Sequence, residues 1–387
     1  MSPHRILMGP GPSDTHPRVL AALAQPTVGH LDPYYLQLMN QMQERLRQVL
    51  ETTNELTLAV SGTGSAGMEA AVVNLVEPGT KMLVCVNGVF GARMADVAQR
   101  VGATVFQLEK PWGEVFSPEE IEAALRQHQP DVTGIILAET STGAWQPVEE
   151  IARRVHDHGG VIIVDAVTGL GGVPVRTDAW ELDCVYSGTQ KCLGCPPGLA
   201  PITFGPRARQ RIAARRTKVQ SWYLDMTMIA QYWGQDRVYH HTAPINMTYA
   251  LNESLAVLLE EGLSAAHTRH LRQHRALAAG LAALGIDYVA AVEHRLPMLN
   301  AVRIPPGVDD ATVRRELLAR FGIEIGGGLG PFKGKVWRIG LMGYGADSKH
   351  VLLFLAALEQ ILLDQGLKFA PGSSIAAAND VYRFETE

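Results

Sequence analysis

The chain has 387 residues, of which 47% are apolar and 19% charged, and its formal net charge at pH 7 is -5. At roughly 150 residues per domain, this length predicts two or three domains with a sizeable core. The charges form neither a basic stripe nor a long block of one sign, which argues against nucleic acid and anionic membranes as partners. We therefore expect a globular protein whose partner is a small molecule.

The sequence shows neither a targeting segment nor a membrane span. Met1 to Ser13 contains no apolar run of signal-peptide length. The most apolar later stretch, Val351 to Leu363, is broken by Glu359 and Gln360, which interrupt the run a membrane-spanning helix needs. We expect a soluble, cytoplasmic protein.

The four cysteines are too few for a disulfide framework in a chain of this length. Cys192 and Cys195 form one CxxC pair, but Cys85 and Cys184 do not supply the second pair that a zinc site needs. A redox pair would open a helix, whereas Pro196 follows here at once. We predict free thiols and no bound metal.

The first segments in chain order are a rigid turn and a helix. Gly9-Pro10-Gly11-Pro12 cannot form a helix or a central strand, and it could line a site. Asp32 and Pro33 are typical of a helix cap and a first helical residue. An apolar stripe at helical spacing follows and predicts one buried face. The stripe consists of Leu36, Met39, Met42, Leu46 and Val49.

From Leu56 onward, short apolar runs alternate with amphipathic segments. The runs are Leu56 to Val60, Met82 to Val86, Thr104 to Leu108, Gly134 to Ala138 and Val161 to Val164. Their continuous apolarity predicts strands buried on both faces, with helices between them. The fold class is therefore α/β, with a mainly parallel sheet flanked by helices. Ligands of such sheets bind beyond the carboxyl ends of the strands, which is where Asp165 falls.

A glycine-rich turn follows the first of these strands. Gly62, Gly64 and Gly67 fit the GxGxxG pattern, in which backbone amides at a helix start cradle a phosphate. A dinucleotide site would also place a carboxylate at the end of the next strand, where this chain has Val86-Asn87-Gly88. The motif alone leaves open whether the phosphate belongs to a dinucleotide or to another cofactor.

Lys191 and Asp165 together favour a cofactor other than a dinucleotide. The lysine follows a short apolar strand, twenty-six positions after the aspartate. A pyridoxal phosphate enzyme needs such a lysine to form a Schiff base. It also needs a carboxylate to keep the pyridine nitrogen protonated. The pair therefore predicts pyridoxal 5'-phosphate.

Eight separated motifs carry a resemblance to a known family. They span Met8 to Ser13, Ser61 to Asn74, Asn87 to Gly91, Glu139 to Gly143, Val164 to Gly172, Tyr186 to Lys191, Tyr239 to Pro244 and Gly326 to Gly340. With these motifs in order from about Leu7 to Leu363, the chain resembles the class V, fold-type I aminotransferases, and among them the alanine:glyoxylate aminotransferases. The resemblance implies a large domain with a seven-stranded type of sheet and a smaller α+β domain. We expect an arm at 1–20 lining the active site, the large domain at 21–262 and the small domain at 263–387.

The resemblance also implies a role for individual residues. Lys191 would be the Schiff-base lysine and the base that shuttles the α proton, Asp165 would face the pyridine nitrogen, and Phe90 would stack on the ring. The phosphate would be held by a group of residues at two loops, with Ser141 also near the cofactor. That group consists of Thr63, Gly64, Ser65 and Gln190. Animal members carry tryptophan at the position of Phe90 and histidine at that of Ser65.

Two further sets of residues concern the substrate and a second subunit. Arg338 would grip a substrate carboxylate, with Gly9 and Ser141 beside it. Tyr239 and Thr242 match residues that reach the phosphate from the neighbouring subunit, which implies a homodimer with shared active sites.

The segment from Lys218 to Ala243 is rich in Trp, Tyr and Met, and we interpret it as interface and pocket wall. His240 and His241 lie in this segment. If they stand on a strand they point to opposite faces, so we interpret them as structural and not as metal ligands.

The implied reaction moves an amino group from a small L-amino acid, L-alanine first, to glyoxylate, giving pyruvate and glycine by a ping-pong mechanism. Serine:glyoxylate and (S)-ureidoglycine:glyoxylate transamination would use the same residues and remain alternatives. A cysteine desulfurase would need a cysteine between Gly326 and Lys335, where there is none. The alternative of an NAD-dependent oxidoreductase is supported by the GxGxxG motif alone.

Overall fold

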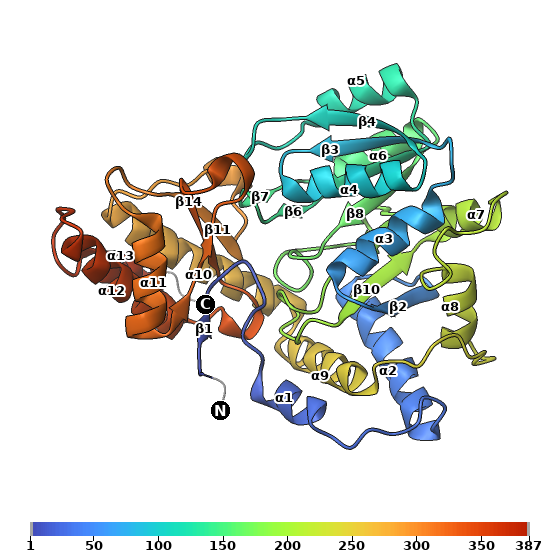
Figure 1. Ribbon diagram of the computed structural model, residues 1–387, viewed down its shortest axis with the longest axis horizontal. Coiled ribbons are helices and arrows are strands. Elements are labelled where there is room, and N and C mark those ends of the chain that lie inside the picture. Colours follow the sequence, from blue (N-terminus) through green and yellow to red (C-terminus); the bar gives the residue numbers. More distant parts are fainter. Residues whose placement is uncertain (1–2, 385–387) are drawn as a thin grey trace.

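A computed structural model of the protein describes residues 3–384, so the outermost residues of the predicted arm and of the predicted small domain lie outside it. Its centre is a seven-stranded sheet with the strand order β2-β10-β9-β8-β5-β3-β4 (Figure 1). The strands are β2 Leu56–Ser61, β3 Lys81–Val86, β4 Thr104–Glu109, β5 Val132–Ile136, β8 Val161–Asp165, β9 Cys184–Tyr186 and β10 Leu199–Phe204. Only β10 runs antiparallel to its neighbours, which confirms the mainly parallel sheet.

One predicted strand is divided in the structure, whereas the other four differ from their expected bounds by one residue at one end. The run Gly134 to Ala138 is divided between β5, which ends at Ile136, and β6 (Ala138–Glu139). The chain leaves the sheet at this point, and β6 pairs with β7 (Ala144–Trp145) in a separate antiparallel ribbon. Apolarity alone did not reveal the break, because every residue from 132 to 145 except Trp145 is buried whether or not it belongs to the large sheet.

Helices cover both faces of the sheet. In Figure 1, α3 (Gly64–Leu75) and α4 (Val89–Arg100) lie in front of it, and α6 (Glu149–Asp157) lies behind. The remaining helices of this larger unit are α1 Pro17–Leu23, α2 Pro33–Val49, α5 Pro118–His128, α7 Pro206–Ala213, α8 Met226–Trp233 and α9 Ile245–Glu261.

The sequence signals at helix starts are confirmed. The Asp32 carboxylate accepts a hydrogen bond from the Tyr34 amide at 2.8 Å, with Pro33 as the first helical residue of α2. Its predicted stripe is buried except for Leu36, which is half-buried.

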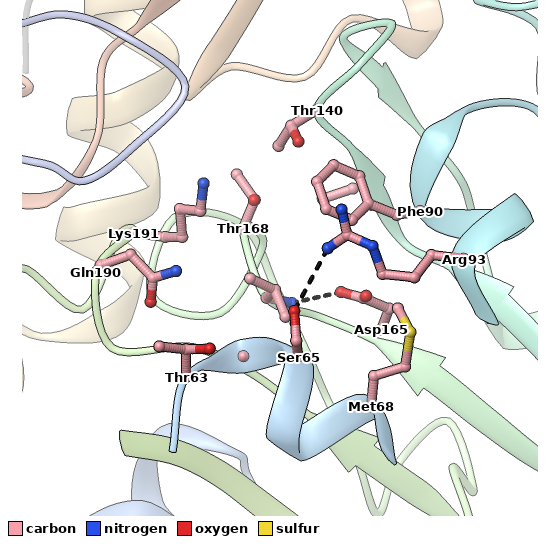
Figure 2. A pocket seen from close by; sticks show the side chains of 13 residues that line it. Thr63, Ser65, Met68, Phe90, Arg93, Thr140, Asp165, Thr168, Gln190 and Lys191 are labelled. Carbon is pink, nitrogen blue, oxygen red and sulfur yellow. Dashed lines mark hydrogen bonds between the residues drawn. The ribbon is translucent and has the colours of Figure 1, made fainter. Parts of the chain in front are cut away.

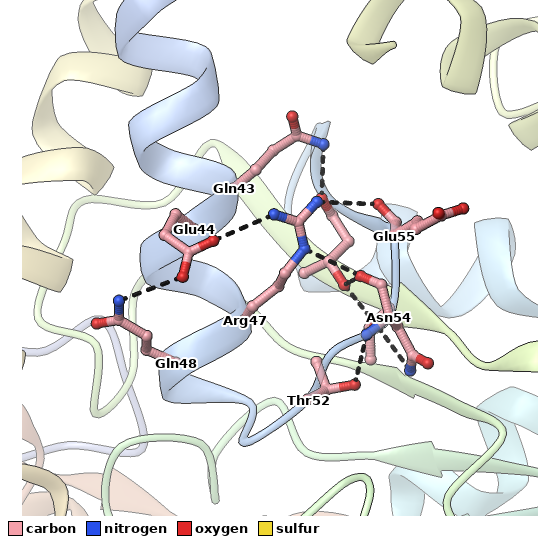
Figure 3. A network of polar contacts seen from close by, with 9 residues as sticks. Gln43, Glu44, Arg47, Gln48, Thr52, Asn54 and Glu55 are labelled. Carbon is pink, nitrogen blue, oxygen red and sulfur yellow. Dashed lines mark hydrogen bonds and ion pairs between the residues drawn. The ribbon is translucent and has the colours of Figure 1, made fainter.

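A polar network fixes the end of α2 to the start of β2 (Figure 3). The Arg47 guanidinium donates to the carbonyl of Asn54 at 3.1 Å and to that of Glu55 at 3.3 Å. The Gln43 amide donates to the Thr57 carbonyl at 3.0 Å. These contacts tie α2 to the turn before the edge strand β2 and to Thr57 on that strand, and they fix the strand that leads to Thr63.

The smaller unit lies beside the larger one and has a core of its own (Figure 1). A three-stranded antiparallel sheet is formed by β11 (Leu299–Arg303), β14 (Val336–Gly340) and β13 (Gly326–Gly327). The helices around it are α10 Leu263–Ala283, α11 Asp310–Phe321, α12 Ser348–Asp364 and α13 Ser373–Phe384, and the 3-10 turns are η1 Val292–His294, η2 Gly330–Phe332 and η3 Gly343–Gly345.

The N-terminal segment connects the two units. Strand β1 (Ile6–Leu7) pairs in parallel with β12 (Ile323–Glu324) of the smaller unit. Residue 20, where the predicted arm ends, lies inside α1, and α1 packs against α9 of the larger unit. Within residues 3–384, no helix is both long enough and apolar enough to cross a membrane.

Candidate active site

A cavity of about 180 Å³ lies where β8 ends and α3 begins (Figure 2). This position agrees with the rule that ligands of parallel sheets bind beyond the carboxyl ends of the strands. The structure gathers seven of the predicted residues around it, namely Thr63, Gly64, Ser65, Phe90, Asp165, Gln190 and Lys191. Its other lining residues are Met68, Arg93, Ala138, Thr140, Val167 and Thr168, none of which was predicted.

Asp165 is the last residue of β8 and is almost completely buried. Its carboxylate accepts hydrogen bonds from the Val167 amide at 2.8 Å and from the Tyr186 hydroxyl at 2.7 Å. Burial raises the pKa of Asp165 to about 6, although both hydrogen bonds and the charge of Lys191 oppose the rise. Tyr186 reaches the carboxylate because β8 and β9 place residues 165 and 186 side by side, a register that the sequence does not reveal.

Lys191 lies in the loop after β9 with its side chain buried. Burial lowers the pKa of its amine to about 8, and the charge of Arg338 lowers it further while Asp165 opposes the change. The amine donates a hydrogen bond to the Pro10 carbonyl. Ser13 holds the same loop, since its hydroxyl donates to the Lys191 carbonyl at 2.7 Å.

The start of α3 has the features of a phosphate cradle. Thr63 is the N-cap residue, yet its hydroxyl makes no capping bond and stays available to a ligand. A Cβ on Gly64 would lie 3.2 Å from the Val167 side chain, so glycine lets the start of α3 pack closely against Val167. Gln190 Oε1 is buried without a hydrogen-bond partner among the described residues. Free backbone amides and a free hydroxyl fit a phosphate ester. From Gln190, only the side-chain NH2 group could donate to a phosphate, because Oε1 is an acceptor.

Ser141, which was expected to contact the cofactor or the substrate, is not among the residues that line the cavity. Its buried hydroxyl donates to Glu139 at 2.6 Å and accepts from the Val89 amide at 3.1 Å. Glu139, which sequence reasoning missed, also accepts a bond from the Phe90 amide at 3.1 Å. Burial raises the pKa of this carboxyl. The two side chains therefore hold the start of α4 and fix Phe90 from behind the wall, while the buried Thr140 lines the cavity instead.

Arg338 lies on β14, buried, and outside the residues that line the cavity. Its Nε donates to the Gly327 carbonyl at 2.7 Å, and burial lowers the pKa of its guanidinium. No carboxylate in the described part of the chain forms an ion pair with it, which leaves the two terminal nitrogens for a ligand. Gly9 passes close to residues 324–326, and the Met8 carbonyl accepts from the Gly340 amide at 2.7 Å.

Tyr239 and Thr242 do not line this chain's own cavity. The Tyr239 side chain is 58% exposed, and its hydroxyl lies 3.4 Å from that of Thr242. No other residue between 218 and 243 lines the cavity either, and part of this segment forms the unpredicted helix α8. This segment therefore forms no wall of the chain's own cavity, and its predicted place at an interface stays a prediction.

The two adjacent histidines, His240 and His241, contact each other, with 2.8 Å between their Nδ1 atoms. The argument that they point apart is wrong, because this stretch is not a strand. Their structural role is supported by packing, since His240 stacks on Trp222 with 4.3 Å between ring centroids. Within residues 3–384, His, Cys, Asp and Glu side chains form no group of three that could hold a metal ion.

The four cysteines are free and buried. Burial raises the pKa of Cys192 and of Cys195 to about 12, so both remain thiols at neutral pH. This agrees with the predicted free thiols in a tight loop.

Comparison with known proteins identifies the family. The model of the family "Aminotransferase class-V" matches residues 9–332. The chain belongs to the class V aminotransferases. As expected for that family, it is a transaminase that depends on pyridoxal phosphate, and the question left open by the GxGxxG motif is answered against a dinucleotide.

Three similar proteins show how far the likeness extends. A crystal structure of alanine–glyoxylate aminotransferase from Nostoc sp. is 50% identical, with 94% of this chain and 96% of that chain covered and a TM-score of 0.92. Ureidoglycine–glyoxylate aminotransferase from Bacillus subtilis is 40% identical, with 99% of both chains covered and a TM-score of 0.97. Alanine–glyoxylate aminotransferase from Rattus norvegicus is 40% identical, covering 93% of this chain and 88% of its own length.

The segment over Lys191 gives a prediction for this aminotransferase. Gly11 has φ +104°, and a Cβ there would lie 2.5 Å from the lysine Nζ. Gly79 has φ +87° with nothing within 4 Å of an added Cβ, so Gly79→Ala carries the same kind of backbone strain without the collision. We expect Gly11→Ala to weaken attachment of pyridoxal phosphate about tenfold, the effect of a modest overpacking penalty. Gly79→Ala should leave it unchanged.

Attachment can be followed by the absorbance of the bound cofactor, with thermal unfolding of each apoprotein as a measure of strain. Equal losses of attachment in both variants would show that strain, and not contact with Lys191, causes the effect.

Proposed function

We propose that the protein transfers an amino group from a small L-amino acid, L-alanine first, to glyoxylate, with pyridoxal 5'-phosphate as cofactor and a homodimer as the working unit. The observation that carries the proposal is the meeting of the buried side chains of Lys191 and Asp165 in one cavity, with Arg338 close enough to lower the pKa of the lysine.

The cavity offers a contact for each part of the cofactor. Thr63, Gly64 and Ser65 would hold the phosphate through amides and hydroxyls, and the side-chain NH2 group of Gln190 would donate to it. Phe90 would pack against the ring. When bound, pyridoxal phosphate supplies an electron sink for the charge that develops at the substrate α carbon.

Asp165 and Lys191 divide the electrostatic and proton-transfer work between them. With a pKa of about 6, the Asp165 carboxyl is ionised at neutral pH and favours a proton on a ring nitrogen beside it. The Lys191 Nζ, with a pKa of about 8, is partly neutral at neutral pH and can accept a proton from the α carbon and return it. An unperturbed lysine, with a pKa of about 10.4, would almost always be protonated and could not act as this base.

Arg338 supplies the contact that every substrate of this reaction shares. Amino donors and keto-acid acceptors both carry a carboxylate, and the terminal nitrogens of a guanidinium can bind it bidentately. L-alanine and glyoxylate are among the smallest molecules that satisfy this site, and the Nostoc and rat proteins are named for both.

(S)-Ureidoglycine is the second candidate donor, because the Bacillus subtilis relative with a TM-score of 0.97 is named for it. L-Serine is a third. The carboxylate clamp and the lysine serve all three donors equally, so the donor side chain decides between them.

A homodimer is supported by exposed aromatic side chains on one sequence segment. Trp222 and Tyr239 are each 58% exposed and Tyr223 is 41% exposed, an unusual density for a solvated surface. We propose that this segment covers the active site of the partner subunit, with Tyr239 and Thr242 reaching its phosphate site. We also place the protein in the cytoplasm, since four unpaired buried thiols suit a reducing compartment.

A panel of amino donors tests the substrate proposal. L-alanine, L-serine and (S)-ureidoglycine would each be supplied with glyoxylate or with pyruvate, and the keto acid and glycine products measured. We expect the highest kcat/KM for L-alanine with glyoxylate. A donor with a kcat/KM more than about tenfold above that of L-alanine, a difference of 1.4 kcal/mol in transition-state stabilisation, would replace it in the proposal.

Mixing two inactive variants tests the shared site. Lys191→Ala removes the lysine, and Tyr239→Ala removes the side chain proposed to serve the partner. In a mixed dimer, one site then keeps both wild-type residues, so random exchange should restore about one quarter of all sites. Fluorescence transfer between labelled subunits would verify that exchange occurs. Exchange without any recovered activity would contradict the shared site.

A further inference from the structure

Arg93 is an exposed residue that lines the cavity, and it has no role so far. It is located on α4, one turn after Phe90. Its guanidinium carbon lies 4.9 Å from the centroid of the Phe90 ring, and its Nη1 lies 3.4 Å from the Ser65 hydroxyl (Figure 2). The side chain therefore extends from α4 across the cavity toward the start of α3.

Within residues 3–384, no carboxylate forms an ion pair with this guanidinium. The other arginine of α4, Arg100, is paired with Asp96 at 2.8 Å. The only carboxylate that lines the cavity, Asp165, already accepts two hydrogen bonds from its own neighbours. Arg93 thus presents a positive charge to the cavity, with one long hydrogen bond to a neutral hydroxyl, and this charge also opposes the rise that burial causes in the pKa of Asp165, without forming an ion pair with it.

The position of Ser65 shows what kind of anion fits. Ser65 is the second residue of α3, so its hydroxyl lies among the first free amides of that helix. An anion bound by these amides lies within reach of any group that touches the Ser65 hydroxyl. Arg93 is that group, and an arginine fork suits several oxygens of one phosphate.

Charge balance leads to the same ligand. The charged residues that line the cavity are Asp165, Lys191 and Arg93. A phosphate ester carries close to two negative charges at neutral pH. The lysine amine is required for the reaction, and the helix start supplies only about half a positive charge. Without Arg93, no full positive charge would be left to offset the phosphate.

We propose that Arg93 binds the phosphate group of the cofactor together with the start of α3, an inference that rests on the proposed function. The Phe90 ring supports the guanidinium before the ligand arrives, because an arginine stacked on an aromatic face loses less freedom when it binds. Arg93 is then a binding residue that acts on the phosphate end of the cofactor and not on its reactive aldehyde.

Ligands with and without the phosphate test this directly. Apoprotein would be titrated with pyridoxal 5'-phosphate, with pyridoxal and with inorganic phosphate, using quenching of tryptophan fluorescence and equilibrium dialysis. Arg93→Gln should weaken pyridoxal 5'-phosphate binding about 10- to 100-fold, the range for a lost charge-assisted hydrogen bond. Pyridoxal should bind to Arg93→Gln as it does to the unaltered protein, which also shows that the variant is folded.

Two further variants sharpen the result. Arg93→Lys keeps the charge and loses the fork, so we expect a smaller loss than in Arg93→Gln. Arg100→Gln removes an exposed, ion-paired arginine from the same helix and should change no affinity. Inorganic phosphate should compete with pyridoxal 5'-phosphate in the unaltered protein and compete less in Arg93→Gln.

The outcomes separate the two proposals. If the unaltered protein binds neither pyridoxal 5'-phosphate nor pyridoxal, the proposed function fails. If it binds both, and Arg93→Gln either binds them with unchanged affinity or loses both equally, only the role of Arg93 is overturned. Unchanged cofactor affinity with a raised KM for glyoxylate would assign Arg93 to the substrate and would also overturn the proposal.

Discussion

Asp165 and Lys191 are ionisable side chains of opposite charge, and the fold buries both at the carboxyl ends of neighbouring strands. Burial disfavours charge on each, raising the pKa of Asp165 to about 6 and lowering that of Lys191 to about 8. The Tyr186 hydroxyl and the Val167 amide offset part of this cost for the carboxylate. The sheet thereby holds a carboxyl and an amine whose pKa values both lie near neutral pH. Neither side chain would have such a pKa in water.

The lysine is also a point of contact between the two units. The segment from Met8 to Ser13 is bonded to Gly340 of the smaller unit at one end and to the Lys191 loop at the other, and Pro10 accepts a bond from the lysine amine. Arg338 lies two residues before Gly340 on the same strand.

Sequence reasoning recovered what depends on local pattern. The parallel sheet followed from apolar runs, the cap of α2 from Asp32, and the site from strand-end and glycine-turn positions that seven lining residues occupy. Contacts set by register or by packing of distant segments were not readable, as the bonds of Tyr186 to Asp165 and of Glu139 to Phe90 show. For Ser141, the position in the motif placed the residue near the site. It could not tell whether the hydroxyl faces the cavity or, as in the structure, bonds to Glu139.

The central claim is that one cavity lysine, Lys191, carries the cofactor. Incubation with pyridoxal 5'-phosphate, reduction with borohydride and mapping of the modified peptide by mass spectrometry measure this without relying on turnover. We expect a single reduced pyridoxyl group per chain at Lys191, and none in Lys191→Ala. A label at another lysine, or an unchanged yield in Lys191→Ala, would contradict the account.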